Sequence, residues 1–332
     1  MKLVDFRSEA NPLGPSNKAK AVLRKLVRHV GDFTPDPAAA LRRYIARREN
    51  VGDENIVVGN GSTHILDALL ALRKPGTAVI PKPVSPRYER MLTDHGVALK
   101  ALHFDPDQDF SVDPDALIEG IRESDIAILP NPHDMTGAVV PGDEIGRIME
   151  EADKYEKALI LDETHIDYTG VVSPVASVVV SRPVVILRTF STFHGLGGLR
   201  VGYAIGPAGL IGDVKAAIRP FHMNVLGPQA ALASLKDKGF RRRTLLFVEG
   251  EKAYLREKLA RIDGIKCYVS PGNLIIARAG TQAHDVKKAL LNRGLLVDDF
   301  VDDGDGLYIK APVRSRRLNA LFARTLARVM AV

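Results

Sequence analysis

The sequence contains very little cysteine and no tryptophan: among 332 residues there is one cysteine, Cys267. A single thiol excludes an intrachain disulfide framework and a metal cluster held by several cysteines. No apolar run reaches the length of a membrane span. The N-terminal stretch MKLVDFRSEANPLGPS lacks the apolar segment and the cleavage pattern of a secretion signal. The simplest interpretation is a cytoplasmic protein with no membrane partner and no metal site.

The composition is that of an ordinary globular protein, with 45% hydrophobic and 26% charged residues. The length suits one large domain with a smaller one. The net charge of +6 is mildly basic, and the denser basic clusters at 241–243 and 314–317 lie beside amphipathic helical patterns. No recognised nucleic-acid motif accompanies them. We therefore expect solvated helix faces there and no nucleic-acid partner.

Helical and strand patterns alternate over residues 37–211. The predicted helices are 39–49, 62–73, 86–96, 115–123 and 142–155. The predicted strands are 55–60, 77–81, 97–104, 125–130, 158–163 and 184–190. Several of these strands are short, continuous apolar runs, which indicates burial on both faces. This pattern predicts an α/β fold with a mostly parallel sheet flanked by helices.

The pattern changes after residue 219. A long helical segment, 228–263, precedes strand-like runs around 265–280 and 304–313 and a last helix at 315–332. This order predicts a smaller α+β unit, with a boundary near residues 220–235.

Polar residues follow the apolar runs at four strand ends. The sequences are GNGS, NPHDMTG, ETHID and TFSTFHG. In an open α/β sheet, ligands bind beyond the C-terminal ends of the strands. We therefore expect these four loops to form one polar rim.

Three positions on this rim have a functional and a structural interpretation, and both stay open. Gly61 and Ser62 begin a predicted helix, and Ser62 is placed to cap it. This helix start is either an anion-binding site or an ordinary capped turn. Asp162 ends a buried strand and needs either a backbone partner or a cationic ligand atom. Arg200 follows GLGG and is either a phosphate clamp or a surface ion pair.

The motifs taken together resemble one family. NPLGPS, GNGS, NP...TG, LDE..ID, RTFS...GL.GLR.GYAI and PGN occur in the order and spacing of class I/II aminotransferases, which are fold-type I enzymes dependent on pyridoxal phosphate. The histidinol-phosphate aminotransferase and threonine-phosphate decarboxylase group is the nearest. The resemblance implies a homodimer with its sites at the subunit interface. It also implies an N-terminal arm (1–30) that belongs partly to the small domain, a large domain (31–225) and a small C-terminal domain (226–332).

The resemblance assigns roles to residues that match the family. Asp162 would meet the pyridine nitrogen of the cofactor, and Asn273 in PGN is retained beside the substrate. The residues that would hold the phosphate are Gly61, Ser62, Ser191 and Arg200.

Other positions depart from the family pattern. Thr192 stands where the family has the lysine that forms the Schiff base, and threonine cannot form an aldimine. Asp134 and His165 replace an asparagine and a tyrosine that bond the phenolic oxygen of the cofactor. Ser85 stands where the family has the aromatic residue that stacks on the cofactor ring. Thr34 replaces the tyrosine that reaches the phosphate of the other subunit, and Tyr308 replaces the arginine that binds the substrate carboxylate.

Three further side chains are candidates for a modified site. Lys310 shares a strand face with Tyr308, because residues two apart point to the same side. It either replaces the missing arginine as a charge for an acidic ligand or faces solvent. His165 and His194 are either acid–base groups or structural hydrogen-bonding residues.

These departures favour a family member with a degenerate active site, a pseudoenzyme. Such a protein binds a small phosphorylated or acidic ligand, or pyridoxal phosphate noncovalently, and performs no standard transamination. Two alternatives stay open. One is an active aminotransferase or amino-acid-phosphate decarboxylase that uses another lysine, such as Lys310 or Lys82. The other is a non-catalytic regulatory partner of an active paralogue.

Overall fold

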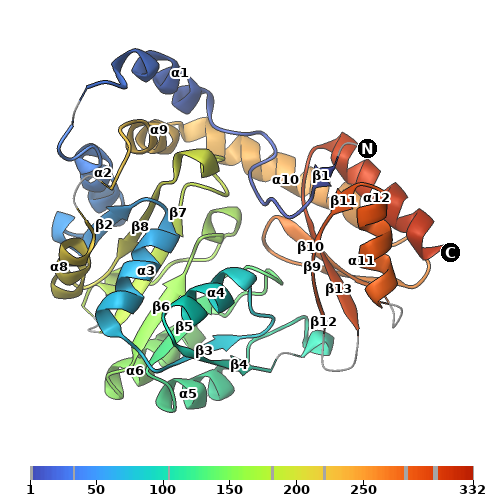
Figure 1. Cartoon of the computed structure of the whole chain (residues 1–332), viewed down its shortest axis with the longest axis horizontal. Helices are drawn as coiled ribbons and strands as arrows, with labels where there is room; N and C mark the ends of the chain where they lie inside the picture. Colours follow the sequence, from blue (N-terminus) through green and yellow to red (C-terminus); the bar gives the residue numbers. More distant parts are fainter. Residues whose placement is uncertain are drawn as a thin grey trace.

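A seven-stranded sheet forms the centre of the larger part of the molecule (Figure 1). The computed structural model describes residues 3–32, 34–103, 105–180, 183–219, 222–279, 283–301 and 306–331. In spatial order the strands of this sheet are β2 (Ile56–Gly59), β8 (Gly202–Ile205), β7 (Val184–Thr189), β6 (Ala158–Asp162), β5 (Ile126–Pro130), β3 (Thr77–Pro81) and β4 (Ala98–Leu102). Strand β8 runs antiparallel to both of its neighbours, and the other pairs of this sheet that lie side by side are parallel. The predicted α/β class with a mostly parallel sheet is confirmed.

The apolar runs explain the position of each strand in the sheet. Strand β5 reads IAILP, and all five residues are buried, as a central strand with helices on both faces requires. Strand β4 reads ALKAL and lies at the edge of the sheet, where its residues are exposed or half-buried. A lysine is tolerated there because an edge strand meets solvent.

Two layers of helices cover the sheet and bury its two faces in separate cores. One face packs against α2 (Ala39–Glu49), α5 (Pro114–Arg122), α6 (Gly142–Lys154), α7 (Val175–Val178) and α9 (Leu226–Leu235). The other packs against α3 (Ser62–Arg73), α4 (Pro86–Asp94) and α8 (Ala208–Ala217). Both layers place helix N-termini near the carboxyl ends of the parallel strands. None of the described helices is both long and apolar enough to cross a bilayer.

Two details differ from the sequence prediction. Ser62 was predicted to cap α3, but Gly61 is the N-cap residue and Ser62 is the first helical residue. The turn from β2 into α3 requires a φ of 89° at Gly61, which glycine adopts without steric cost. The predicted helix 228–263 is two helices, α9 and α10 (Lys238–Leu259), which separate at Asp237.

The smaller unit contains a four-stranded antiparallel sheet in the order β12 (Asp298–Val301), β13 (Leu307–Pro312), β10 (Leu274–Ala279) and β9 (Ile265–Val269). Helices α11 (Ala283–Asn292) and α12 (Arg316–Met330) pack on it (Figure 1). The N-terminal strand β1 (Val4–Asp5) pairs with β11 (Leu295–Leu296), and Phe6 enters the core of this unit. The start of the chain is therefore part of the smaller unit.

Two helices connect the units. Helix α1 (Asn17–Leu26) packs on α9, and both contribute to the core of the larger sheet. Helix α10 crosses from one unit to the other (Figure 1). Its Phe240 packs with Phe193 of the larger unit, whereas Leu255 lies in the core of the smaller one.

Candidate functional site

A cavity of about 290 Å³ opens at the carboxyl ends of the parallel strands, where the N-terminal segment and β13 meet the larger sheet. All of the described residues that line it are polar or charged. The hydroxyl-bearing ones are Ser62, Thr63, Ser85, Thr164, Thr189, Ser191 and Thr192. The charged or titratable ones are Arg7, Glu9, Arg87, Asp134, His165, Arg200, Asp298 and Lys310. The loops that were predicted to form one rim therefore do meet around one cavity, which we call the polar pocket.

One wall of the polar pocket is suited to bind an anion. Ser62 and Thr63 lie in the first turn of α3, where backbone N–H groups and the positive end of the helix dipole face outward. Ser191 and Arg200 line the same pocket. A Cβ atom at Gly61 would lie 2.5 Å from Nη2 of Arg200, so glycine lets the guanidinium approach the helix. Arg200 forms no ion pair with any described residue, which leaves its charge available to a ligand.

Asp162 is bonded by residues of its own chain. It is 1% exposed, and its Oδ2 accepts hydrogen bonds from the Tyr88 hydroxyl at 2.5 Å and from Nη2 of Arg87 at 3.1 Å. Its Oδ1 accepts one from the backbone N–H of Thr164 at 2.9 Å. Burial would raise the pKa of Asp162, but Arg87 and these hydrogen bonds lower it. The cation beside this carboxylate is therefore a guanidinium of the protein itself.

Arg87 connects Asp162 to Asp134. Its Nη2 also donates to the Tyr88 hydroxyl at 2.7 Å and lies 3.5 Å from Oδ2 of Asp134. Burial would lower the pKa of Arg87, but Tyr88, Asp162 and Asp134 raise it, so the guanidinium stays charged. Asp134 is 7% exposed, and its Oδ1 has no hydrogen-bond partner among the described residues. The sequence analysis did not identify Arg87 or Tyr88; the available signal was their position in the first turn of a helix that follows a strand end.

The N-terminal segment brings Glu9 into the polar pocket. Its carboxylate forms an ion pair with Lys310 and lies 3.0 Å from Nε2 of His165. Asn273 donates from Nδ2 to the Glu9 carbonyl at 3.1 Å and so fixes the segment. Burial would raise the pKa of Glu9, but His165 and Lys310 lower it. Burial would lower the pKa of His165, but Glu9 raises it.

Lys310 is therefore not solvent-facing: it is 4% exposed and paired inside the pocket. The sequence did not indicate a role for Glu9, because no local pattern predicts that Glu9 meets His165 and Lys310, which lie far from it in the sequence.

Thr192 is tied to the backbone around it. Its Oγ1 donates to the carbonyl of Thr164 at 2.8 Å, and its own carbonyl accepts from the N–H of Asn11 at 3.0 Å. The hydroxyl thus holds two strand-end loops together, while the carbonyl holds the N-terminal segment. Its contacts are those of a structural residue at the edge of the pocket.

Three candidates lie outside the polar pocket. Tyr308 is fully buried in an aromatic cluster, where its ring stacks on Phe300 with centroids 5.0 Å apart. Thr34 is exposed and does not line the pocket. His194 lines a different cavity, where its Nδ1 lies 2.8 Å from Oγ of Ser234.

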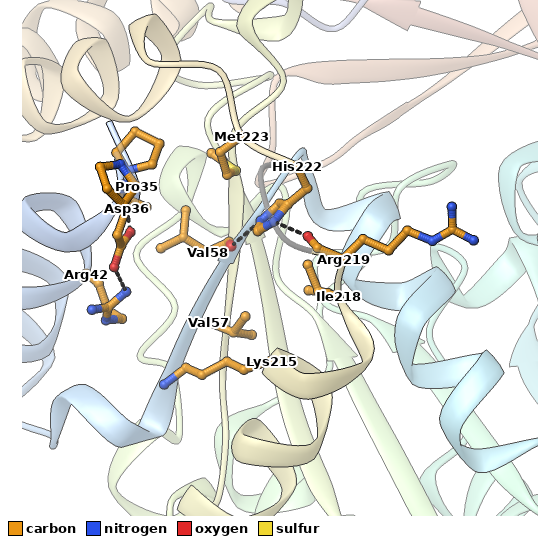
Figure 2. Close-up of a pocket in the computed structure, with 12 residues that line it drawn as sticks. Pro35, Asp36, Arg42, Val57, Val58, Lys215, Ile218, Arg219, His222 and Met223 are labelled. Carbon is orange, nitrogen blue, oxygen red and sulfur yellow. Dashed lines mark hydrogen bonds and ion pairs between the residues drawn. The ribbon is translucent and has the colours of Figure 1, made fainter. Parts of the chain in front are cut away.

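A further cavity of the same volume, about 290 Å³, lies beside β2 and the end of α8 (Figure 2). Its floor is apolar and includes Val57 and Ile218. Some of its polar groups bind one another: Arg42 pairs with Asp36 at 2.9 Å, and the His222 ring lies 3.3 Å from the carbonyl of Val58. The polar pocket is the better candidate for a charged ligand, because every described residue that lines it is polar or charged.

Comparison with known proteins gives consistent matches. The model of the family described as aminotransferase class I and II matches residues 3–302. A histidinol-phosphate aminotransferase of Bacillus subtilis (strain 168) is 30% identical over 304 residues, which cover 89% of this chain and 83% of the relative. Histidinol-phosphate aminotransferase 1 of Thiobacillus denitrificans is 31% identical over 338 residues, which cover 99% of this chain and 86% of the relative.

Solved structures share the fold. The histidinol-phosphate aminotransferase of Sinorhizobium meliloti in complex with pyridoxal-5'-phosphate superposes with a TM-score of 0.91 at 20% identity, over 99% of this chain and 92% of the other. The L-threonine-O-3-phosphate decarboxylase of Porphyromonas gingivalis gives a TM-score of 0.83 at 21% identity, over 99% of this chain and 100% of the other. At these identities the likeness demonstrates a common fold and nothing finer.

Pyridoxal phosphate fits the polar pocket only in part. The pocket offers its phosphate the N-terminus of α3, Ser191 and Arg200. The carboxylate of Asp162, however, is already bonded by Arg87 and Tyr88. Apart from His165, no aromatic residue lines the described part of the pocket. The residues present thus match the phosphate and leave the ring without a stacking surface.

Proposed function

Since the chain belongs to the class I and II aminotransferase family, we propose that it binds a small phosphorylated ligand, or pyridoxal phosphate noncovalently, and performs no Schiff-base transamination. The observation that carries this proposal is the contrast within the polar pocket. The anion-binding wall, with Arg200 and the first turn of α3, has unpaired donors. The position that the family resemblance assigns to the Schiff-base lysine carries Thr192, whose hydroxyl is bonded to Thr164.

The wall of the pocket supports binding of a phosphate in particular. A phosphate has several acceptor oxygens, and it gains most where backbone N–H groups, hydroxyls and a guanidinium converge. Ser62, Ser191 and Arg200 supply these groups. A guanidinium without an ion-pair partner in the described structure favours a dianion over a neutral ligand.

A second candidate is an active aminotransferase or decarboxylase that uses Lys310. One observation favours it: the Lys310 amine lies in the same pocket. An amine must be unprotonated to attack an aldehyde, and the buried ion pair with Glu9 opposes that state. We therefore rank this candidate below noncovalent binding.

Thermal unfolding with and without inorganic phosphate tests the proposal. Phosphate is expected to raise the Tm of the wild type, because a ligand that binds only the folded state stabilises it. It should have no effect on Arg200→Met. Arg73→Met is a matched control, because Arg73 is exposed at the opposite end of the same helix. Absence of a phosphate effect on the wild type would overturn the proposal.

Borohydride reduction in the presence of pyridoxal phosphate, followed by mass spectrometry, separates the two candidates. We expect no covalent adduct on the wild type and an adduct at the substituted position in Thr192→Lys. An adduct on Lys310 of the wild type would instead establish the second candidate. Sedimentation equilibrium on the same samples tests the homodimer that we propose together with this function.

A further inference from the structure

Beyond its phosphate-binding wall, the polar pocket has features that specify the rest of the ligand. This inference rests on the proposed function, because it assumes that a phosphate binds at the first turn of α3. The first feature is the absence of apolar residue types from the described part of the lining. Every residue that lines the described part of the pocket is polar or charged. Tyr88, the ring nearest to the charged cluster, is fully buried beneath Arg87, whose guanidinium carbon lies 4.4 Å from the ring centroid.

This lining disfavours a flat aromatic ligand. An aromatic ring gains its binding free energy from stacking and from burial of apolar area. The pocket instead presents a set of side-chain hydroxyls together with several charges. Such a wall binds a ligand that carries many hydrogen-bonding groups of its own.

The second feature is an acceptor and a donor side by side, Asp134 and Arg87. Oδ1 of Asp134 is buried without a hydrogen-bond partner in the described structure, which is costly until a donor arrives. Arg87 uses only Nη2 for its contacts with described residues, and its side chain is 30% exposed in the pocket. Its Nε and Nη1 are therefore available to an acceptor on a ligand.

Only some chemical groups satisfy both partners. A carboxylate or a second phosphate would be attracted by Arg87 but repelled by Asp134. An ammonium group would be attracted by Asp134 but repelled by Arg87. A hydroxyl group donates one hydrogen bond and accepts another, so it matches the pair without net repulsion.

The third feature concerns the cations near β13. Lys310 and His165 are both held by the Glu9 carboxylate. A carboxylate on a ligand would have to compete with Glu9 for these two groups. The pocket therefore lacks an open anchor for an amino-acid carboxylate at this end.

From these three features we propose that the ligand is a phosphorylated polyol or sugar, with its phosphate at the first turn of α3 and a hydroxyl between Asp134 and Arg87. The shared chemistry is a phosphomonoester on a neutral, hydroxyl-bearing carbon chain. Asp134 and Arg87 are the residues that would recognise its hydroxyls.

Isothermal titration calorimetry with two matched probes tests this inference. Ribitol 5-phosphate and n-pentyl phosphate have the same carbon chain and the same phosphate, and only the first carries hydroxyls. We expect ribitol 5-phosphate to bind at least tenfold more tightly to the wild type. Asp134→Asn should weaken ribitol 5-phosphate about tenfold and leave n-pentyl phosphate unchanged, since a hydrogen bond to a charged acceptor is stronger than one to a neutral amide. Asp213→Asn, at an exposed carboxylate of α8, is the control.

The outcomes distinguish this inference from the proposed function. If neither probe binds and inorganic phosphate does not protect, the proposed function fails. If both probes bind equally, or if Asp134→Asn weakens both equally, phosphate binding stands and the polyol inference is overturned. Pyridoxal phosphate that binds more tightly than ribitol 5-phosphate would also overturn it, because an aromatic ring would then be preferred.

Discussion

Asp162 and Glu163 are neighbours at the end of β6, and each lies in a buried charged cluster with an arginine, yet the two clusters differ in how completely they are paired. Glu163 accepts hydrogen bonds from Oγ of Ser173 at 2.7 Å and from Nε of Arg188 at 2.9 Å. Arg188 also donates from Nη1 to Oε1 of Glu49 at 3.0 Å. None of these residues lines the polar pocket, and each of the two carboxylates has an arginine partner within the protein.

The cluster around Asp162 is incomplete. Arg87 contacts Asp162, Tyr88 and Asp134 through a single nitrogen, and Oδ1 of Asp134 has no partner in the described structure. Buried polar groups are normally paired, so an unpaired one next to a cavity indicates where a ligand completes the network. We base the proposed site on this difference: both clusters contain buried charge, and only the cluster around Asp162 combines incomplete pairing with the polar pocket.

The largest difference between the clusters is expected from arginine-to-methionine substitutions. Arg188→Met leaves the buried Glu163 without a cation and the half-buried Glu49 with Arg48 alone, which should lower the free energy of unfolding by about 3–5 kcal/mol. Arg87→Met should lower it by about 1–2 kcal/mol, because Asp162 keeps two other hydrogen bonds. Urea denaturation measures both variants. Equal losses of unfolding free energy would mean that Arg87 is as important for stability as Arg188, and the two clusters would then not differ as we propose.

Much of the fold could be predicted because it depends on local sequence pattern. The apolar runs of β5 and β6 specified central parallel strands, and the polar residues after them specified the rim. The cap of α3 was assigned to Ser62 because serine is a common N-cap residue, but the backbone turn places Gly61 there. The break between α9 and α10 was not predicted, because the amphipathic pattern continues through it.

The candidate site was less predictable because its pairings are tertiary. The strand-end rule and the family resemblance located Ser62, Ser191 and Arg200 at one pocket. The contacts of Glu9 with Lys310 and of Arg87 with Asp162 join residues that no sequence spacing relates. Because these contacts decide which charges remain open, the identity of the ligand had to be inferred from the structure.

A smaller effect is expected when Glu9 is neutralised. Glu9→Gln leaves Lys310 and His165 buried without a carboxylate, which should cost about 3 kcal/mol at pH 6. Glu9 raises the pKa of His165 in the folded state, so protonated His165 contributes stability that is fully present below its ordinary pKa of about 6.5. That contribution is lost as the pH rises through the raised pKa.

The cost of Glu9→Gln should therefore be smaller at pH 9 than at pH 6. Urea denaturation at both values measures it. Asp32→Asn, which breaks the exposed pair between His29 and Asp32, is the control and should change stability little at either pH. The same cost at pH 6 and pH 9 would show that Glu9 acts only through Lys310.

The smallest expected effect separates two threonines within the polar pocket itself. The Thr192 hydroxyl is bonded to the Thr164 carbonyl, so Thr192→Val should lower the free energy of unfolding by about 1 kcal/mol and leave phosphate affinity unchanged. The Thr63 hydroxyl has no partner among the described residues, so Thr63→Val should change stability by less than about 0.5 kcal/mol and weaken phosphate binding several-fold. Urea denaturation and calorimetric titration with phosphate measure the two quantities on each variant. If Thr192→Val instead weakened binding without loss of stability, its hydroxyl would belong with the unpaired, ligand-binding groups. The distinction between paired and unpaired groups would then not predict function at the resolution of single side chains.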